Sequence, residues 1–271
     1  MGSEDVLYRK EDGIGIITLN RPEKMNSVTL EMFSQIRALC NEIKTDNEVR
    51  AVILTGNGLA FSAGTDLSGR ASDGDGASKR KEAPTDRILL TPSAFDRYSL
   101  WDFTAIPKPT ICAINGVAVG IASEWPLHCD FRIAAESARW GQVFVMRGWV
   151  PDTGAGTYLL PRIVGLSKAL ELVFSARIID AQEMLSIGLV SRVVADDQLM
   201  VAAMAMAKTV TRGAPLAVKM TKELMYRGLE RGIEEHLYAT SSAFSALSGT
   251  EDNKEGIKAF IEKREPHWQG R

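Results

Sequence analysis

The feature that most constrains this chain is a pair of glycine-containing turns, each placed directly after an apolar run. Residues 58–67 (G-L-A-F-S-A-G-T-D-L) follow the run 51–55, and residues 115–124 (N-G-V-A-V-G-I-A-S-E) follow the run 110–114. Short apolar runs bounded by turn residues are typical of buried strands. The sequence therefore predicts two buried strands that end in tight turns, the second of which opens into a helix near Ile121.

Turns of this kind leave backbone N–H groups without a partner, and a helix that begins at such a turn adds positive potential there. Two turns that each donate one N–H to the same oxygen would stabilise negative charge that develops on it during a reaction. An ordinary strand-to-helix turn, in which glycine only supplies a positive φ, is the simpler explanation of either turn alone. Convergence of the two turns on one oxygen is therefore our central hypothesis.

Further short motifs follow in order along the chain. They are residues 19–27 (L-N-R-P-E-K-M-N-S), 129–134 (C-D-F-R-I-A), 139–142 (R-W-G-Q), 150–156 (V-P-D-T-G-A-G), 160–165 (L-P-R-I-V-G) and 259–266 (A-F-I-E-K-R-E-P). With the two turns, this ordered set resembles the crotonase superfamily, the enoyl-CoA hydratase/isomerase family, over nearly the whole chain. The resemblance implies an α/β fold with a crotonase-like ββα spiral core and a C-terminal helical oligomerisation region.

Composition agrees with one large α/β domain. The chain has 271 residues, of which 45% are hydrophobic, and its net charge of −2 with a pI near 6.0 gives no sign of a nucleic-acid or membrane surface. The three cysteines, Cys40, Cys112 and Cys129, lack metal-ligand spacing and sit in apolar contexts, as small core residues of a reducing cytoplasm do. We expect a cytoplasmic protein without a bound metal or a membrane span.

The pattern along the chain changes near residue 195. Before it, runs 6–9 and 14–19 flank a Glu-Asp-Gly turn and predict a hairpin, and strands are expected at 131–134, 138–140 and 189–194. After it, helices are expected at 199–212, 216–228, 233–247 and 252–264. We therefore predict a spiral core with the acyl-CoA site in residues 1–195 and a helical region in residues 196–271. The resemblance implies a homotrimer or a hexamer built as a dimer of trimers.

Residues 68–82 are polar and rich in glycine, which predicts a loop that can cover an acyl pocket. Lys79, Arg80 and Lys81 in this loop either meet CoA phosphates or are simply solvated, and solvation is the commoner fate of such a run. Residues 87–103 predict a helix that borders the acyl chain in the family.

The resemblance assigns the oxygen site to the backbone N–H groups of Ala63 and Ile121. Because the α-protons of a thioester are acidic once the enolate is stabilised, two such donors would hold the thioester oxygen during proton removal. The backbone does this work, so Ile121 can stand where relatives usually have glycine.

Two carboxylates are candidates for moving the proton. Glu124 matches one of the two glutamates of the hydratases, while Phe144 occupies the position of the other and cannot exchange a proton. Asp152 stands where hydratases commonly have glycine, and several relatives carry an acid there. Glu124 and Asp152 would then form an acid–base pair. Each also has a structural alternative, as a first-turn carboxylate for Glu124 and as a helix N-cap for Asp152.

Other residues are expected to contact the substrate. Arg21, Lys24 and Met25 lie on the segment that follows the CoA nucleotide in the family, and Lys263 near the carboxyl end matches a segment that often approaches it from a neighbouring subunit. The two turns and the pocket wall add further contacts, which we assign to Ala60, Ser62, Gly64, Asp66, Leu67, Gly120, Phe144 and Trp149. His128, one helical turn after Glu124, can share its face.

These residues predict an acyl-CoA thioester enzyme that uses enolate chemistry, in the hydratase/isomerase class, with no cofactor other than the coenzyme A that is part of its substrate. Hydrolysis or displacement at an acyl-CoA, with Asp152 as nucleophile or base, is the alternative reaction. A relative that binds acyl-CoA without catalysis is the alternative from another class, because the second glutamate is missing.

Overall fold

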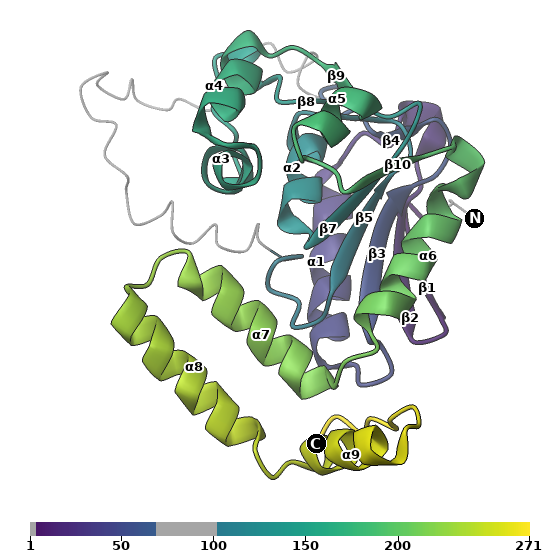
Figure 1. The fold of residues 1–271 in the computed structure, drawn as a ribbon. Helices are drawn as coiled ribbons and strands as arrows, with labels where there is room; N and C mark the ends of the chain where they lie inside the picture. Colours follow the sequence, from purple (N-terminus) through teal and green to yellow (C-terminus); the bar gives the residue numbers. More distant parts are fainter. Residues whose placement is uncertain (1–3, 69–101) are drawn as a thin grey trace.

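The computed structural model describes residues 4–68 and 102–271, and its centre is a six-stranded sheet with the order β1-β2-β3-β5-β7-β10 (Figure 1). Neighbouring strands from β2 onward are parallel. The predicted α/β class is confirmed. The strands of this sheet are β1 (Val6–Glu11), β2 (Ile14–Leu19), β3 (Ala51–Gly56), β5 (Thr110–Ile114), β7 (Phe131–Ala135) and β10 (Arg192–Val194).

The first two strands form the predicted hairpin. β1 pairs antiparallel with β2, and Glu11 is opposite Ile14. Asp12 and Gly13 between them have φ values of 51° and 74°. Two successive positive φ values give the turn whose twist suits a two-residue hairpin, and Asp-Gly is a preferred sequence for it.

A second, four-stranded sheet has the order β4-β6-β8-β9. Its strands are β4 (Ala60–Ser62), β6 (Val117–Val119), β8 (Arg139–Gly141) and β9 (Ile179–Asp180). Each of β4, β6 and β8 comes a few residues after a strand of the large sheet, so a long strand and a short strand alternate in the spiral manner expected. The segments that precede β4 and β6 approach each other closely at Gly116, where a Cβ atom would lie 2.0 Å from the Leu59 carbonyl oxygen. Only glycine permits this approach.

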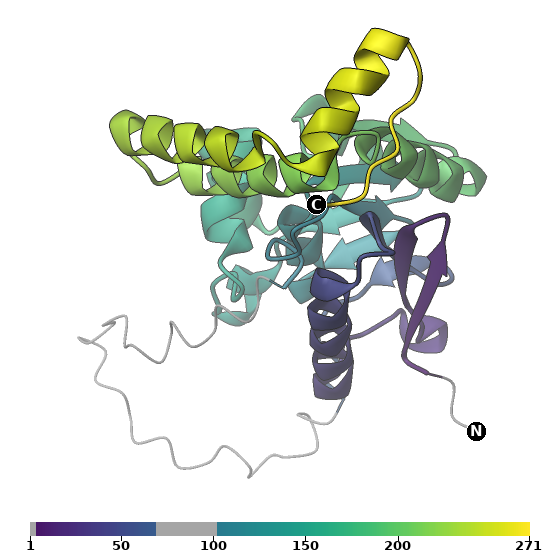
Figure 2. The ribbon, with the colours of Figure 1, turned by 90° about the horizontal axis from the view of Figure 1, so that it is seen from below.

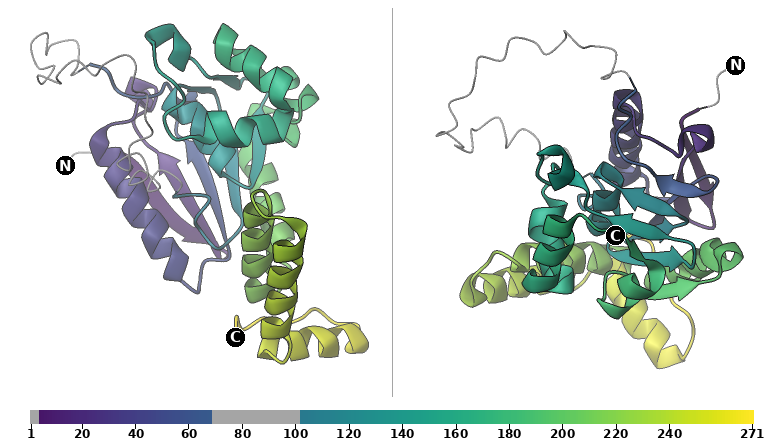
Figure 3. Two further views of the ribbon diagram at one scale, coloured as in Figure 1. Left: turned by 90° about the vertical axis from the view of Figure 1, so that its left-hand side faces the viewer. Right: turned by 90° about the horizontal axis from the view of Figure 1, so that it is seen from above.

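Helices cover both faces of the large sheet (Figures 1 and 3). Successive side chains of a strand point to opposite faces, so each strand contributes to two cores. One core contains α1 (Leu30–Thr45) against residues such as Ile17 and Leu54. The other contains α6 (Leu199–Val210) against Ile16 and Ile53. Parallel strands buried on both faces explain the continuous apolar runs in the sequence.

The remaining helical elements surround this core. They are η1 (Pro22–Lys24), α2 (Ile121–His128), η3 (Phe144–Arg147), the π-helix η4 (Ala155–Leu159), α3 (Leu160–Val164), α4 (Leu166–Ser175), α5 (Ala181–Ser186), η5 (Asp196–Gln198), α7 (Pro215–Gly228), α8 (Ile233–Leu247) and α9 (Glu251–Glu262). The expected helices of the carboxyl-terminal part are all present as α6 to α9.

The helices after α6 leave the sheet. α7 and α8 run side by side, and α9 turns away beyond them (Figures 1 and 2). Large apolar side chains on these helices are exposed, including Leu237, Phe244 and Phe260. The division at residue 195 stays a prediction, and α6 lies on the core side of any such boundary because it covers the sheet. None of the helices in residues 4–68 and 102–271 is both long and apolar enough to span a membrane.

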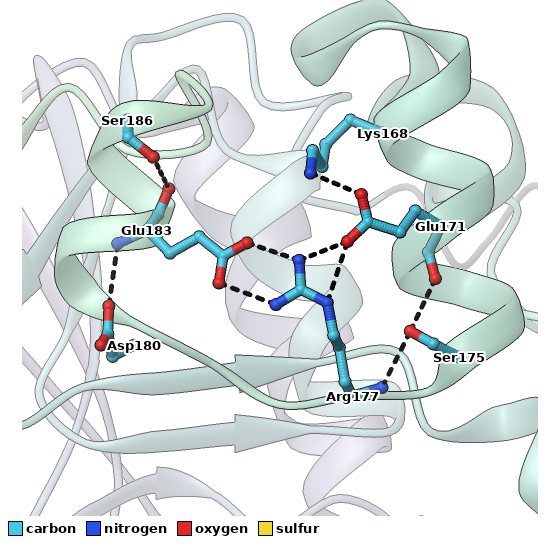
Figure 4. A network of polar contacts seen from close by, with 7 residues as sticks. All are labelled: Lys168, Glu171, Ser175, Arg177, Asp180, Glu183 and Ser186. Carbon is cyan, nitrogen blue, oxygen red and sulfur yellow. Dashed lines mark hydrogen bonds and ion pairs between the residues drawn. The ribbon is translucent and has the colours of Figure 1, made fainter.

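A network of charged side chains fixes α4 to α5 beside β9 (Figure 4). The Arg177 guanidinium contacts Glu171 on α4 at 2.6 Å and Glu183 on α5 at 2.5 Å. Lys168 adds a second contact to Glu171 at 2.5 Å. Arg177 therefore joins the two short helices α4 and α5 through one carboxylate of each.

Candidate active site

The two glycine turns meet, as the sequence predicts. β4 and β6 are parallel neighbours, with Ala60 opposite Val117. Parallel strands end at the same edge of a sheet, so the turns that follow them are brought together. Gly64 and Gly120 both have positive φ, at 92° and 59°. A Cβ atom at Gly64 would lie 2.8 Å from the Val119 carbonyl oxygen, so glycine is required for this contact.

The second turn presents the N–H of Ile121. This residue starts α2, and among the described residues its N–H has no hydrogen-bond acceptor. The first N–H groups of a helix point away from the helix body and lie at the positive end of its dipole. The Ile121 N–H is therefore available among the described residues, and its role as a donor to substrate stays a prediction.

The first turn does not present the N–H of Ala63, and here the prediction is wrong. That N–H donates to the Met25 carbonyl at 2.9 Å. The backbone beyond it pairs with Val28, whose N–H donates to the Gly64 carbonyl and whose carbonyl accepts from the Asp66 N–H. Backbone groups alternate sides along an extended segment, so the intervening Thr65 N–H points away from Val28.

We therefore replace Ala63 with Thr65 as the donor of the first turn. No acceptor for the Thr65 N–H lies within residues 4–68 and 102–271. Thr65 directly follows Gly64, which contacts the Gly120 turn. The sequence signal that could have found it is the preceding glycine, which has a positive φ and marks where the chain turns.

Glu124 lies in the first turn of α2 with none of its surface exposed. Its carboxylate accepts hydrogen bonds from the Thr153 N–H at 2.8 Å and from the Thr153 hydroxyl on Oε2, and from the Gly156 N–H at 2.6 Å on Oε1. The alternative of a solvated first-turn carboxylate is therefore wrong. Thr153 and Gly156 were not among the predicted site residues, because their contact with Glu124 depends on how two distant segments pack.

Burial raises the pKa of the Glu124 carboxyl above its usual value, and this is the largest influence on it. The hydrogen bonds from Thr153 and Gly156 stabilise the ionised form and oppose part of that rise. The negative charge of Asp152 raises the pKa further. A buried carboxylate with a raised pKa is suited to accept and return a proton near neutral pH.

Asp152 is adjacent in sequence to Thr153, and its side chain is exposed whereas Glu124 is buried. The structural alternative of a helix N-cap is wrong for Asp152, because Gly154 holds that position at the start of η4. Gly154 has a φ of 83° and the Gly156 N–H is directed at Glu124, and the segment that follows is the π-helix η4 and then α3.

Gln142 is a buried residue of this site that the predictions missed. None of its surface is exposed, and among the described residues neither amide atom has a hydrogen-bond partner. A Cβ atom at Gly156 would lie 2.6 Å from both Gln142 Oε1 and Glu124 Oε1, so the amide and the carboxylate flank the same small space. Buried polar groups are normally paired, so an amide left unpaired here is available to a bound molecule.

Phe144 and Trp149 are the predicted pocket residues on η3 and just beyond it. Phe144 is buried and starts η3 two residues after Gln142. Trp149 is 48% exposed, and its N–H donates to the Phe144 carbonyl at 3.2 Å. An apolar ring therefore stands where the resemblance places the second glutamate of the hydratases.

The segment expected to follow the CoA nucleotide is tied to the first turn. Arg21 donates to the Ser27 carbonyl at 2.7 Å and contacts Asp66 at 3.0 Å. Hydrogen bonds from Ser68, together with Arg21, hold the pKa of the Asp66 carboxyl well below its usual range. Arg21 and Asp66 thus pair with each other, and substrate contact by either stays a prediction.

The other predicted binding residues fall into two groups. Lys24, Met25 and Leu67 are exposed beside the turns, whereas Ala60 and Ser62 are buried within β4. The buried pair supports the turn through hydrogen bonds. Asn26 and Asn115 donate to the Ala60 carbonyl at 2.7 and 3.1 Å, respectively. The Ser62 hydroxyl accepts from the Gly64 N–H at 3.2 Å.

Lys263 is not brought to the turns within one chain. It caps α9, which lies at the bottom of Figure 1, beyond α7 and α8 and away from α2. Its approach to CoA from a neighbouring subunit stays a prediction. Apart from Ser68, the predicted loop at residues 68–82, with Lys79, Arg80 and Lys81, lies outside the described residues, and so does most of the predicted helix at residues 87–103. Within the described residues no group of three or more His, Cys, Asp or Glu side chains is placed to hold a metal ion.

Comparison with known proteins gives consistent matches over the full length. Residues 9–271 match the family model described as enoyl-CoA hydratase/isomerase. The short-chain-enoyl-CoA hydratase of Clostridium acetobutylicum is 38% identical, with 97% of each chain covered. The crotonyl-CoA hydratase of Syntrophomonas wolfei is 31% identical, with 99% of each chain covered. The crystal structure of an enoyl-CoA hydratase from Bacillus anthracis superposes with a TM-score of 0.88 at 33% identity, covering 99% of this chain and 100% of that one.

Proposed function

This chain belongs to the enoyl-CoA hydratase/isomerase family, and we propose that it moves a proton at the α-carbon of an unsaturated acyl-CoA through an enolate intermediate. The observation that carries the proposal is the meeting of the Gly64 and Gly120 turns directly in front of the helix that bears Glu124. The thioester oxygen would accept from the N–H groups of Thr65 and Ile121. Removing one such donor costs about 3–4 kcal/mol of transition-state stabilisation in other enzymes.

Glu124 would act as the base that takes the α-proton. Its raised pKa brings the carboxyl closer to the operating pH, where proton transfer in both directions is efficient. Three hydrogen bonds from Thr153 and Gly156 fix its orientation, which a base needs in order to select one proton of the substrate.

Asp152 would be the second member of the acid–base pair. It is exposed where Glu124 is buried, and its charge raises the pKa of Glu124, so the two carboxyl groups interact. Two carboxylates in different surroundings divide into an acid and a base. Such a pair returns the proton to a different carbon, which is double-bond isomerisation.

Isomerisation is favoured over hydration because of Phe144. A hydratase of this kind needs two carboxylates that hold one water molecule, and an apolar buried ring stands at the second position. Hydration is nevertheless the second candidate. The relatives that match over the whole chain are named hydratases, and the interaction of Asp152 with Glu124 offers a different second carboxylate. Hydrolysis with Asp152 as nucleophile is the third outcome to be tested.

A panel of CoA thioesters incubated in heavy water separates these reactions by mass. Deuterium gained in the acyl group without added water supports the proposal, especially with 3-enoyl and dienoyl thioesters. Gain of one water establishes hydration, and release of free CoA establishes hydrolysis. A protein that binds the thioesters but leaves every mass unchanged would be a binding relative, and the proposed function would be abandoned.

We also propose that the protein needs no cofactor beyond the CoA of its substrate, that it acts in the cytoplasm, and that it assembles as a homotrimer or a dimer of trimers. Exposed apolar side chains on α8 and α9, such as Leu237, Phe244 and Phe260, support an assembly that covers them. Three buried free cysteines, Cys40, Cys112 and Cys129, suit a reducing compartment.

A further inference from the structure

A second titratable side chain, His128, lies fully buried behind Glu124. It is four residues later on α2, so the two side chains share one helix face. His128 Nε2 lies 2.9 Å from the Thr153 hydroxyl oxygen, and that hydroxyl also contacts Glu124 Oε2. The Ala155 N–H donates to the same hydroxyl oxygen at 3.2 Å. The Thr153 hydroxyl therefore joins the imidazole to the carboxylate.

These contacts define the position of each proton when Glu124 is ionised. An ionised carboxylate only accepts hydrogen bonds, so the Thr153 hydroxyl donates to Glu124. The two lone pairs of the hydroxyl oxygen then accept from the Ala155 N–H and from His128. Burial lowers the pKa of His128 to about 3, so the ring is neutral at physiological pH. Its single proton must therefore lie on Nε2.

The two oxygens of the Glu124 carboxylate differ in how many hydrogen bonds they accept. Each carboxylate oxygen offers about two lone-pair sites. Oε2 accepts from the Thr153 N–H at 2.8 Å and from the Thr153 hydroxyl, so both of its sites are taken. Oε1 accepts from the Gly156 N–H at 2.6 Å and shares a small space with the Gln142 amide. Among the described residues, one site on Oε1 is left without a donor.

We propose that His128 is a positioning residue that fixes the Thr153 hydroxyl as a donor to Glu124, so that Glu124 accepts the substrate proton on Oε1. The proposal rests on the proposed function, because it takes Glu124 as the base. It deepens that function by naming the atom that receives the proton. It also gives the buried imidazole a role in which its own protonation never changes.

The proton transfer forms one bond and breaks one. The bond between the α-carbon and its hydrogen breaks, its electron pair enters the enolate, and the proton bonds to Glu124 Oε1. Thr153 keeps its hydroxyl proton, and His128 keeps the proton on Nε2. Protonation of Oε2 instead would require the Thr153 hydroxyl to turn and donate to His128, whose Nε2 already carries a proton. The neutral imidazole therefore excludes that alternative.

The ionisation of Glu124 responds to each group around it. Burial and the negative charge of Asp152 raise the pKa of Glu124, and the hydrogen bonds from Thr153 and Gly156 lower it. His128 is neutral, so it acts through the direction of the Thr153 hydroxyl and not through charge. Without the His128 donor the hydroxyl is free to turn away from Glu124. The ionised form then loses stabilisation, so the pKa of Glu124 rises and the acid limb of activity moves to higher pH.

The first test measures which nitrogen of His128 carries the proton. The chain has three histidines, so a His236→Gln/His267→Gln variant of the full chain leaves His128 as its single imidazole. Nitrogen-15 NMR distinguishes a protonated from an unprotonated ring nitrogen. We expect the proton on Nε2 at neutral pH and still on Nε2 after Glu124 is protonated at lower pH. A proton on Nδ1 in either state, or a doubly protonated ring at neutral pH, overturns the proposal.

The second test changes the donor. His128→Gln keeps an N–H near the position of Nε2, whereas His128→Met fills a similar space without a donor. The titration of Glu124 is read from the acid limb of kcat/KM and, without turnover, from carbon-13 NMR of its carboxyl group, assigned with Glu124→Gln. We expect His128→Met to raise the midpoint by about half a pH unit, since neighbouring hydrogen bonds strengthen one another by a fraction of their energy. His128→Gln and the control His236→Met should titrate as wild type.

A double variant separates positioning from packing. If His128 acts through the Thr153 hydroxyl, His128→Met should cause no further shift once Thr153→Val has removed that hydroxyl. An equal shift in both backgrounds, or wild-type titration in folded His128→Met, overturns the proposal and leaves the proposed function standing. If His128→Met does not fold, the NMR measurement on the intact ring still decides. The expected titrations in a protein that turns over no thioester of the panel would overturn the proposed function and leave the hydrogen-bond arrangement standing.

Discussion

The Gly156 N–H donates to Glu124 Oε1 at 2.6 Å, and the same residue has no room for a side chain beside that oxygen. A Cβ atom there would lie 2.6 Å from Glu124 Oε1, 2.6 Å from Gln142 Oε1 and 2.8 Å from the Pro151 Cβ. The position of the carboxylate therefore depends on a glycine 32 residues away in sequence. The π-helix η4, which contains Gly156, therefore helps to position the proposed catalytic base.

Gly156→Ala is expected to abolish most turnover. The added methyl group must displace the carboxylate, the amide or Pro151, and overpacking of this kind costs about 1–3 kcal/mol of stability. We expect kcat to fall much more than the melting temperature, because the displaced group is the base. Steady-state kinetics and a thermal melt check this. Gly232→Ala is the matched control, since that glycine has a φ of −67° and open space around it, and it should keep full activity.

Thr153→Val should move the acid limb of the kcat/KM profile to higher pH. The Thr153 hydroxyl stabilises the ionised form of Glu124, so its loss raises the pKa of a carboxyl that burial has already raised. The base must be ionised to accept a proton, so activity appears only at a higher pH than in wild type. Thr153→Ser keeps the hydroxyl and should restore the wild-type profile. An unshifted acid limb in folded Thr153→Val would show that Glu124 is not the group that titrates.

The sequence predicted which segments form this site better than it predicted which backbone N–H groups face the substrate. Apolar runs and glycines located both turns, because burial and positive φ leave a strong local signal. Ala63 was the wrong donor because the direction of an N–H depends on the pairing of residues 64–66 with Val28, a contact between distant segments. The roles of Thr153, Gly156 and Gln142 depend in the same way on packing that no local pattern records.

The helical part shows the same limit. Periodicity located α6, yet the sequence did not indicate that Ala202, Ala203 and Ala207 lie against the sheet while α7 onward does not. Helical periodicity, which the two segments share, does not separate them, although α6 is apolar over most of its length and α7 carries charged residues among its apolar ones.

Arg177→Met should lower the melting temperature by about a few degrees, because it frees two carboxylates that hold α4 and α5 (Figure 4). Lys168 with Arg177 lowers the pKa of Glu171, and Arg177 lowers that of Glu183. A depressed carboxyl pKa stabilises the folded protein above the unfolded pKa, and this contribution is lost as pH falls through the folded pKa. The difference between wild type and variant should therefore shrink below about pH 4.

Thermal melts at neutral and acidic pH test this expectation. Lys254→Met is the control, because Lys254 makes one exposed pair with Glu251 at 2.8 Å within a single helix. Such a pair contributes little, so the control should melt with wild type. An equal difference between Arg177→Met and wild type at both pH values would mean that the arginine acts through packing and not through charge.

Asp152→Asn and Glu124→Gln should differ in which activity remains, exchange at the α-carbon or isomerisation. Glu124→Gln removes the buried base, so deuterium exchange at the α-carbon should fall by about 10²–10⁴. Asp152→Asn removes the exposed partner and its negative charge, so α-exchange should persist while the proton is no longer delivered to another carbon. Exchange and isomerisation are measured on the same samples by mass and by product separation. Full isomerisation by Asp152→Asn would remove Asp152 from the mechanism.

Phe144→Glu is expected to shift the reaction toward hydration. Phe144 starts η3 two residues after Gln142, whose amide shares a small space with Glu124, so a carboxylate there would stand near the pair that a hydratase needs. Burying the new charge will lower stability, so a melt must first establish that the variant is folded. Phe144→Gln, of similar size without the charge, is the control and should not add water. The product mass decides the outcome: gain of one water by Phe144→Glu alone supports the reason for preferring isomerisation. A folded Phe144→Glu protein that still only relocates the double bond would mean that Phe144 is not what separates this chain from the hydratases.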